Sequence, residues 1–352
     1  MSSFNNFKNK KVLYIGPLQF GGTCLQRMNA LIELGFYVFT IDTSLSSTRT
    51  IFAKAYDKLI STIFNNKDIA SANKKICESI IAENYDIVWI DKGLTIKPET
   101  IQKIKNSPYK TIVISFSPDD MLNPNNQSKF YLQCLPLYDF HITTKSFHLH
   151  ELSSMGAKNV LMMNNAFCPN SHRPIQIDLD EKAKIGGSVG FIGFWEKERE
   201  EYIEYLAQNN ILVRVWGPWP KYRKYHKNIK VEGKLVLGDD YAKTICSFDI
   251  NLCFLRKINR DLQTTRSIEI PACGAFMLAE RSNEHQNLFE EGIEADYFDS
   301  KEELLKKVKY YLKNKVDRDR IANAGFNKCL SSGYSYKERL GLIIDNILNK
   351  NL

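Results

Sequence analysis

Asp261, Arg266 and Glu269 are the residues of this chain whose types and spacing best suit a charged, hydroxyl-bearing ligand. A guanidinium group matches phosphate with a fork of N–H donors, and a carboxylate accepts hydrogen bonds from hydroxyl groups. An Arg-x-x-Glu pair on an exposed helix is usually a weak surface interaction. Here Ile268 and Ile270 predict that the helix is mostly buried. Because a buried Glu beside an Arg needs a partner or a ligand, we expect these residues to form a site.

The elements around these residues predict where the site would lie. An apolar strand is expected at 249–255, followed by a polar loop at 256–265. A helix is expected to begin near Thr264 and to end at Cys273, before a buried strand at 275–279. This order of elements places basic groups and backbone N–H donors where a phosphate can bind.

The segment from Arg266 to Gly274 has the pattern Arg-x-x-Glu-Ile-x-Ala-x-Gly. It resembles the glycosyl transferases group 1 C-terminal domain of nucleotide-sugar glycosyltransferases with the GT-B fold. The closest resemblance is to the CgeB-like (spore maturation protein) group. The resemblance extends from about Val189 to Tyr336 and more weakly through the N-terminal half. It implies an α/β protein of the GT-B fold, in which two Rossmann-like α/β domains face each other across a cleft.

The resemblance also implies roles for the two carboxylates. In the wider retaining group, two carboxylates eight positions apart precede a helix end of small residues and a buried strand, as Asp261 and Glu269 do here. Glu269 fits the second position, whose implied role is to hold the ribose of the nucleotide. Asp261 occupies the first position, where the usual residue is the longer Glu, and its implied catalytic role is at the transferred sugar.

A second cationic group follows the strand expected at 188–193. Gly193 ends this strand, and Lys197 and Arg199 come shortly afterwards. In the resembled enzymes, basic residues at this place neutralise the donor diphosphate, which gains charge as the glycosidic bond breaks. Arg199 suits this role better than Lys197, because a fork of donors matches phosphate better than a point charge. The alternative is a solvated, charged helix face.

A glycine pair, Gly21-Gly22, lies between the strand expected at 11–16 and the helix expected at 24–34. Glycines there let the backbone approach a ligand and leave the helix N-terminus open to negative charge. We assign the pair to a phosphate-binding loop on the acceptor side, with a flexible turn as the alternative. The spacing fits neither the Gly-x-Gly-x-x-Gly of a dinucleotide fold nor a Walker loop, which argues against a nicotinamide dehydrogenase.

Asp119 follows the strand expected at 111–116. Many retaining relatives have a His at the end of this strand, whereas Ser117-Pro118-Asp119 contains none. An Asp at this place could be a general base that deprotonates the acceptor hydroxyl, which would suit inversion. It could equally bind acceptor hydroxyls, or act as an N-cap in a Pro-Asp-Asp turn. The sequence therefore leaves the choice between retention and inversion open.

The sequence predicts no required metal ion and no cofactor beyond a nucleoside diphosphate sugar as co-substrate. Asp119-Asp120 and Asp239-Asp240 are adjacent pairs, not the Asp-x-Asp triplet with which GT-A enzymes hold a divalent ion. His148 and His150 alternate, but two ligands without a third do not make a zinc site.

Composition limits the class of protein. The 352 residues, 43% hydrophobic and 25% charged, suffice for two globular domains. No apolar run approaches the roughly 20 residues of a membrane span, and the N-terminus lacks a signal peptide pattern. Several of the eight cysteines lie in apolar segments, as expected of reduced, buried thiols: Cys77, Cys246, Cys253 and Cys273. We expect a cytoplasmic protein, with peripheral contact at the inner face of the membrane as an open alternative.

The net charge of +8 would suit an anionic partner, although the lysines are spread along the chain. No zinc-finger spacing and no RNA-binding strand signature is present, so we expect no nucleic acid partner. The segment from Trp216 to His226 combines tryptophans with basic residues. A basic loop after a strand, a rim that stacks on the donor base and a contact with an anionic membrane remain open for it.

We expect a Rossmann-like acceptor-side domain at 1–168, a Rossmann-like donor domain at 186–335, and a C-terminal helix at 336–352 that packs back toward the first domain. Prolines and dense polar residues predict a linker at 164–185. The remaining expected strands are 37–42, 87–91, 140–144, 159–163, 212–217 and 229–233, and the remaining expected helices are 69–84, 239–247, 301–312 and one from about Glu198.

These features predict a hexosyltransferase-type glycosyltransferase of bacterial polysaccharide or glycoprotein biosynthesis. Its sugar would pass from a nucleoside diphosphate donor to a glycan, lipid-linked or protein acceptor. One alternative is a nucleotide-sugar epimerase on the same scaffold. Another is a catalytically silent surface or spore-coat component, which the short Asp261 and the absent His favour. Arg266, Glu269 and the glycine loop argue against a silent protein, because a structural component has no need of a phosphate site.

Overall fold

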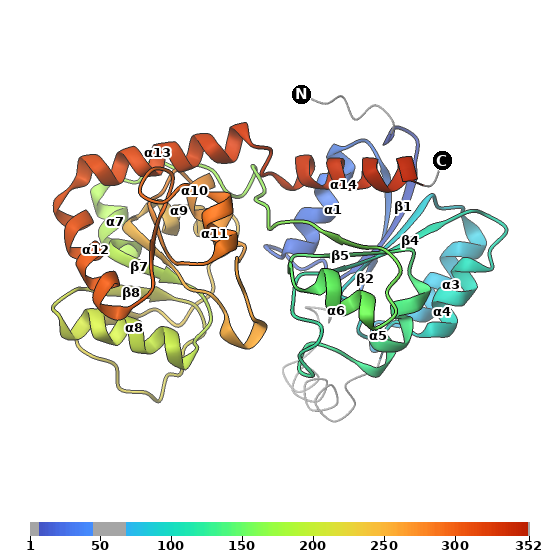
Figure 1. The fold of residues 1–352 in the computed structure, drawn as a ribbon, viewed down its shortest axis with the longest axis horizontal. Helices are drawn as coiled ribbons and strands as arrows, with labels where there is room; N and C mark the ends of the chain where they lie inside the picture. Colours follow the sequence, from blue (N-terminus) through green and yellow to red (C-terminus); the bar gives the residue numbers. More distant parts are fainter. Residues whose placement is uncertain (1–6, 45–67, 351–352) are drawn as a thin grey trace. The chain divides into compact units, whose positions relative to one another are not determined.

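The computed structural model describes residues 7–44 and 68–350. The chain forms two compact units. Unit 1 contains the chain up to Asn164 together with the C-terminal segment from Tyr336, and unit 2 contains Asn165–Ser335. Each unit is built around a parallel sheet of six strands, which confirms the predicted α/β class (Figure 1).

The sheet of unit 1 has the strand order β2-β1-β3-β4-β5-β6. Its central strands are buried along their whole length, as expected of parallel strands covered on both faces. The chain enters the sheet at the interior strand β1, continues to the edge strand β2, and then returns to the other side of β1 as β3. The strand order therefore reverses between β1 and β3. The strands are β1 (Lys11–Gly16), β2 (Tyr37–Asp42), β3 (Ile87–Asp91), β4 (Ile112–Ser117), β5 (Phe140–Thr143) and β6 (Val160–Met162).

Helices cover both faces of this sheet. Buried apolar side chains of α3 (Ala72–Ala82) and α4 (Pro98–Lys105) pack with those of β1 and β3 in one core. A proline at the start of α4 and lysines in its last turn suit the two ends of that helix. The other helices are α1 (Thr23–Glu33), α5 (Lys129–Cys134), α6 (His148–Ser154) and α14 (Tyr336–Lys350).

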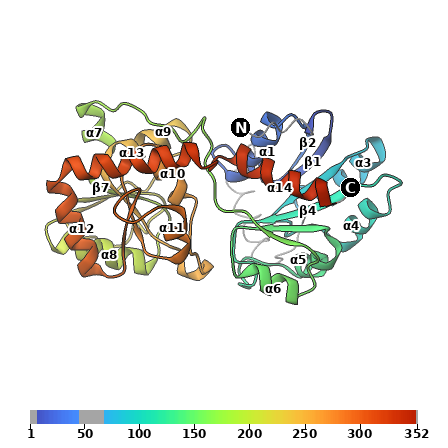
Figure 2. The ribbon, with the colours of Figure 1, turned by 45° about the horizontal axis from the view of Figure 1, so that its top comes forward.

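The last helix completes unit 1. Helix α14 packs beside α1, as Figures 1 and 2 both show. A cation joins the two helices, because the guanidinium carbon of Arg27 in α1 lies 5.9 Å from the ring centre of Tyr336 in α14. The same guanidinium lies 4.1 Å from the ring centre of Phe116 in β4. The chain therefore crosses back to unit 1 after finishing unit 2.

The sheet of unit 2 has the strand order β12-β11-β10-β7-β8-β9. The chain enters at the central strand β7, runs outward through β8 and β9, and then returns to the other side of β7 as β10. The strands are β7 (Gly187–Ile192), β8 (Val213–Trp216), β9 (Ile229–Val231), β10 (Phe248–Cys253), β11 (Met277–Glu280) and β12 (Asp296–Phe298).

Two apolar cores lie on opposite faces of this sheet. Residues of α8 (Lys197–Gln208) and α12 (Lys301–Lys313) pack in one core, and residues of α9 (Asp239–Cys246) and α10 (Arg266–Ala272) pack in the other. The remaining helices are α7 (Leu179–Ile185), α11 (Asn283–Leu288) and α13 (Lys315–Ser331). The sequence did not predict β12, α11 or α13.

The segment that we expected to be a linker, 164–185, belongs almost entirely to unit 2. The N–H of Phe167 donates to the carbonyl of Tyr334 at 3.2 Å, and Phe167 forms an isolated parallel bridge with Ser335. The segment ends in α7, whose N-terminus is capped by Asp178. The polar residues that suggested a linker are thus turn and cap residues of the second unit.

Within residues 7–44 and 68–350, no helix is both long enough and apolar enough to cross a membrane. All eight cysteines are free thiols. Cys253 and Cys273 are buried as expected, whereas Cys77 and Cys246 are half-buried.

Candidate active site

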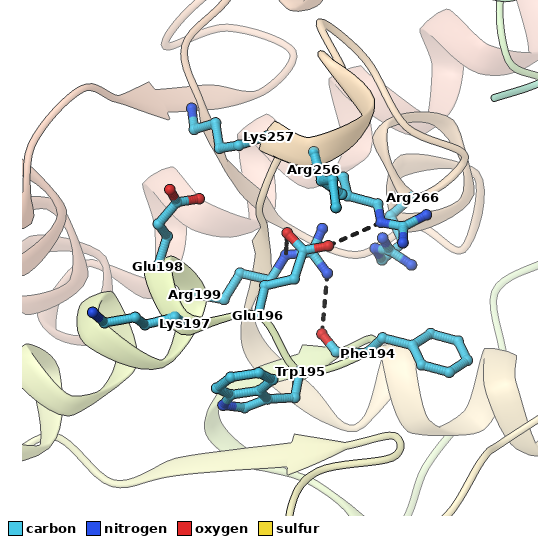
Figure 3. A pocket seen from close by; sticks show the side chains of 10 residues that line it. Phe194, Trp195, Glu196, Lys197, Glu198, Arg199, Arg256, Lys257 and Arg266 are labelled. Atoms are coloured by element: carbon cyan, nitrogen blue, oxygen red, sulfur yellow. Dashed lines mark hydrogen bonds and ion pairs between the residues drawn. The ribbon is translucent and has the colours of Figure 1, made fainter. Parts of the chain in front are cut away.

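A pocket of about 680 Å³ opens in unit 2 at the place where its strand order reverses. The loops after β7 and β10 turn away from each other there, and this divergence leaves a crevice beyond the carboxyl ends of the two strands. Residues 194–199 follow β7 and residues 256–258 follow β10, and both groups line the pocket together with Arg266. The pocket, drawn close up in Figure 3, is therefore a product of the strand order.

Arg199 is the buried cation of this pocket, with 3% of its side chain exposed. Its Nη1 donates to the carbonyl of Phe194 at 3.0 Å, and its guanidinium lies over the ring of Phe191. Its Nε and Nη2 atoms are buried and have no hydrogen-bond partner among the described residues. Burial, with the nearby charge of Arg266, lowers the pKa of Arg199 to about 10. A buried cation with unused donors is a site for an anion.

Arg266 brings a second guanidinium to the same pocket. It is the first residue of α10, and its Nε is also buried without a hydrogen-bond partner in the described part of the chain. Arg266 is close enough to Arg199 for their charges to repel. Two converging arginines with unused donors suit a ligand that carries more than one negative charge.

Four further charged residues line the pocket and were not among the predicted site residues: Glu196, Glu198, Arg256 and Lys257. The Nε of Arg256 donates to Oε1 of Glu196 at 2.9 Å, and Oε2 of Glu196 lies 3.7 Å from Nε of Arg199 (Figure 3). Lys257 lines the same pocket and pairs with Glu280 at 3.1 Å. The sequence predicted basic groups in this loop, but the strand order is what places Arg256 and Lys257 in particular at the pocket.

Lys197 and Gly193 have different places in this arrangement. Lys197 begins α8, is exposed and lines the pocket, and no side chain caps this helix. The N–H of Gly193 donates to the carbonyl of Trp216, and its carbonyl accepts from Trp219. A Cβ at Gly193 would lie 2.6 Å from the ring of Phe191. Gly193 therefore allows close packing, while its own backbone groups are already used within the protein.

Glu269 lies in the first turn of α10 but does not line the pocket. It is 5% exposed, and its Oε2 accepts a hydrogen bond of 2.6 Å from the hydroxyl of Tyr241. Burial, followed by the charge of Glu269, holds the pKa of Tyr241 well above its usual value. The buried His172 approaches the other carboxylate oxygen. The hydrogen bond from Tyr241 thus holds the carboxylate of Glu269, and His172 lies beside it at 3.7 Å.

Asp261 lies in the loop between β10 and α10, outside the residues that line the pocket. It is buried, and its Oδ1 accepts a hydrogen bond of 2.7 Å from the side-chain amide of Asn259. Its backbone N–H donates to the carbonyl of Arg256 at 3.1 Å. The loop that carries Asp261 therefore also fixes the backbone of a pocket arginine.

In unit 1, Gly21 and Gly22 lie at the corresponding reversal of strand order, after β1. Gly21 has a φ of 75°, in the left-handed region that glycine adopts readily. Gly22 precedes α1 as its N-cap, and its N–H donates to the carbonyl of Gln19 at 3.0 Å. The loop is thus a specific turn that leads directly into a helix N-terminus.

Asp119 forms an ion pair of 2.8 Å with Lys92. Burial disfavours the charge of Lys92, but Asp119 together with Cys24 and Asp91 outweighs burial, and the pKa of this lysine is raised. Lys92 has a φ of 65°, an unfavourable value for a residue with a side chain. The preceding residue, Asp91, is held by two hydrogen bonds from the buried Arg27. No described helix begins at Asp119, and Oδ1 of Asp120 accepts a hydrogen bond from the N–H of Leu122 in the following turn.

A histidine does lie close to this place, although the sequence around Asp119 contains none. Nε2 of His148 lies 3.1 Å from Oδ1 of the buried Asp120, and Nδ1 lies 2.8 Å from Oγ1 of Thr143. Asp120, His148 and Glu151 each offer one ligand atom within 4.8 Å of the others. The alternation of His148 with His150 hid this group, because its other members come from a different loop and the next helical turn.

Comparison with solved structures shows what this architecture is. Over 96% of this chain and 99% of the other, it matches the Anabaena protein HepE in complex with UDP-glucose, with a TM-score of 0.64 and 13% identity. A glycosyltransferase from Rickettsia africae matches over 98% of this chain and 100% of its own, with a TM-score of 0.64 and 14% identity. The chain has the GT-B fold.

A solved structure named for a different activity is also similar. A Listeria monocytogenes protein assigned as a UDP-N-acetylglucosamine 2-epimerase matches over 96% of this chain and 95% of its own, with a TM-score of 0.55 and 13% identity. Residues 197–345 match the family model described as glycosyl transferase-like. A comparison with curated protein sequences gave no match. The matched region includes Lys197, Arg199, Arg266 and Glu269.

Proposed function

We propose that this protein is a glycosyltransferase that takes its sugar from a nucleoside diphosphate donor bound by unit 2. The observation that carries the proposal is the pair of arginines, Arg199 and Arg266, with buried N–H donors that no described residue satisfies. Their place at the strand-order reversal is the usual place for a nucleotide in a doubly wound sheet. The family match over 197–345 supports the same activity.

The chemistry of transfer explains why the pocket is cationic. When the bond between the sugar and the diphosphate breaks, the leaving nucleoside diphosphate gains negative charge. Arg199 and Arg266 would stabilise that charge, with Lys197 at the start of α8 as a third cation. Glu269, held by Tyr241 and with His172 beside it, would accept hydrogen bonds from the ribose hydroxyls. Asp261 would contact the transferred sugar.

Unit 1 would bind the acceptor. Gly21 and Gly22 supply the turn in front of α1, and Asp119 would accept the proton of the acceptor hydroxyl or bind that hydroxyl. The acceptor classes that we propose are a glycan, a lipid-linked sugar and a protein. Because the HepE structure contains UDP-glucose, UDP and UDP-glucose are the first compounds to test as donors.

A specific observation supports the alternative that this protein is a nucleotide-sugar epimerase, because the Listeria protein assigned as an epimerase has a similar fold. Incubation with UDP-glucose or UDP-N-acetylglucosamine alone discriminates between the two activities. An epimerase isomerises the sugar without an acceptor, whereas a glycosyltransferase gives only slow hydrolysis until an acceptor is added. Isomerised nucleotide sugar as the main product would overturn the transfer proposal.

Ligand-induced stabilisation tests the donor site before any acceptor is known. A ligand at 100 times its Kd raises the free energy of unfolding by about 2.7 kcal/mol, which shifts the melting temperature measurably. We expect nucleoside diphosphates to stabilise the protein and the bare nucleosides to have little effect. A protein that no nucleoside diphosphate or nucleotide sugar stabilises would favour the silent surface-component alternative.

A further inference from the structure

Glu196 contacts two of the arginines that line the pocket of unit 2. Its Oε1 accepts a hydrogen bond of 2.9 Å from Nε of Arg256, and its Oε2 lies 3.7 Å from Nε of Arg199. Figure 3 shows its carboxylate pointing between the two guanidinium groups. Glu196 immediately precedes α8 as its N-cap residue, but its side chain makes no capping hydrogen bond. The side chain is directed to the arginines instead.

The electrostatics of the pocket explain this orientation. Arg199 is almost completely buried beside Arg266, and burial disfavours its charge. A carboxylate nearby offsets part of that cost. The offset is incomplete, because 3.7 Å is too long for a hydrogen bond and Nε and Nη2 of Arg199 keep unused donors. The side chain of Glu196 is 19% exposed, and that of Arg256 is 45% exposed, so this carboxylate can leave without opening the core.

We propose that Glu196 is an internal counter-ion of the donor site, whose carboxylate competes with the phosphate groups of the ligand. This inference rests on the proposed binding of a nucleoside diphosphate in this pocket. In the free protein, Glu196 partly neutralises Arg199 and Arg256. When the diphosphate binds, its oxygens take the place of the carboxylate, and Glu196 turns toward solvent. The competition lowers the affinity for the diphosphate, and so it speeds the release of the nucleoside diphosphate product.

The opposite role is that Glu196 positions the arginines for the ligand. The two roles predict opposite effects of Glu196→Gln, which removes the charge and keeps the size of the side chain. Loss of a competing charge strengthens anion binding, whereas loss of a positioning contact weakens it. Glu201→Gln is the matched control, because Glu201 lies on the same helix, is about half-exposed, and pairs with Lys301 at 3.2 Å outside the pocket.

The experiment measures the affinities of the full chain and both variants for inorganic pyrophosphate, UDP and uridine by calorimetry. We expect Glu196→Gln to bind pyrophosphate and UDP about three- to tenfold more tightly, and Glu201→Gln to bind them within about twofold of the parent. Uridine affinity should stay the same. Without ligand, Glu196→Gln should melt at a lower temperature than the parent, because its buried Arg199 has lost a counter-charge. Pyrophosphate should raise the melting temperature of this variant more than that of the parent.

Weaker or unchanged binding of pyrophosphate by Glu196→Gln, relative to Glu201→Gln, would overturn the counter-ion role. A different result would contradict the proposed function. If the parent binds pyrophosphate but shows no preference for UDP, the nucleotide assignment is wrong, while the pyrophosphate affinities of the variants still decide the role of Glu196. If no phosphate compound binds at all, both proposals are overturned.

Discussion

Nε2 of His172 lies 3.7 Å from Oε1 of Glu269, and both side chains are buried. The other ring nitrogen, Nδ1, accepts the backbone N–H of Cys168 at 3.0 Å. A nitrogen that accepts cannot carry a proton, so the proton of the neutral ring is on Nε2 and faces Glu269. Burial lowers the pKa of His172, and the charge of Glu269 only partly offsets this, so the ring is neutral at pH 7. A residue from the expected linker thus turns an N–H group toward the candidate ribose ligand.

Two substitutions at His172 separate its hydrogen bond with Cys168 from its contact with Glu269. Asn can replace Nδ1 as the acceptor for Cys168, whereas Gln can reach Glu269 with a donor. If His172 orients Glu269 for ribose, we expect His172→Asn to reduce the preference for UDP over 2′-deoxy-UDP several-fold, and His172→Gln to retain more of it. The measurement is calorimetry with both nucleotides. Equal losses for the two nucleotides in both variants would leave His172 with a purely structural role.

Removal of Arg266 tests the phosphate site. Arg266→Ala should weaken UDP binding by about 1.5–3 kcal/mol, the value of a charge-assisted hydrogen bond, and should leave uridine binding nearly unchanged. Arg320→Ala is a suitable control, because it removes an exposed arginine whose described contact is a carbonyl outside the pocket. Calorimetry with both ligands is the measurement. Similar losses for UDP and uridine would remove Arg266 from the phosphate site.

The variant Asp119→Asn tests whether Asp119 is the general base of the transfer reaction. If Asp119 deprotonates the acceptor hydroxyl, turnover should fall about 10²–10⁴-fold while donor affinity stays nearly unchanged. Because the change also weakens the pair with Lys92, Lys92→Met is the control for loss of the ion pair alone. A loss of turnover as large in Lys92→Met would assign the effect to the pair. If turnover changes little in Asp119→Asn, Asp119 is a polar surface residue and not the base.

Activity should survive excess EDTA, because arginines supply the positive charge that a metal ion would otherwise provide at the diphosphate. The measurement is the rate of transfer or of donor hydrolysis before and after dialysis against EDTA. Loss of activity that added Mg²⁺ or Mn²⁺ restores would contradict a metal-free mechanism. In that case Asp120, His148 and Glu151 would be the first candidates for the ligands.

Buried histidines should make the protein less stable in acid. Burial lowers the pKa of His141 and of His285 from 6.5 to about 4. Between these values the unfolded chain binds protons that the folded chain does not, so the free energy of unfolding falls as the pH drops. Each histidine should cost on the order of 2 kcal/mol at pH 5. Urea unfolding at pH 7 and pH 5 measures the loss.

Variants assign this pH dependence to individual histidines. His285→Asn should remove part of the difference in unfolding free energy between pH 7 and pH 5. His150→Asn should keep the whole difference, because His150 is exposed. An unfolding midpoint that does not move between the two pH values would contradict the shifts of both buried histidines.

Most of the strands could be predicted from the sequence because parallel strands are continuous apolar runs between turn residues. The prediction failed for β12, Asp296–Phe298, which begins with a charged residue and therefore shows no continuous apolar run. It also failed for α13, where polar residues surround a few buried ones such as Ile321. Both elements are fixed by tertiary packing, which a single sequence does not display.

The part of the candidate site that could be predicted consists of residues that also belong to a local sequence pattern. Arg266 and Glu269 stand one helical turn apart, and Arg199 follows a strand, so each had a local signal. Nothing in the sequence joins Glu196 to Arg256, or His172 to Glu269, because only the tertiary fold brings these distant segments together. The same reason hid His148, which meets Asp120 only after β4 and β5 have paired.

The return of α14 to unit 1 has a consequence for how the chain is made. Synthesis completes unit 2 before the ribosome has added the helix that covers α1 and contacts Arg27. The usual order, in which the N-terminal domain folds first, is therefore reversed for the final step. Unit 1 therefore keeps the surface of α1 that α14 covers exposed until this last helix has been made. A chaperone that acts on the nascent chain would meet that surface on unit 1.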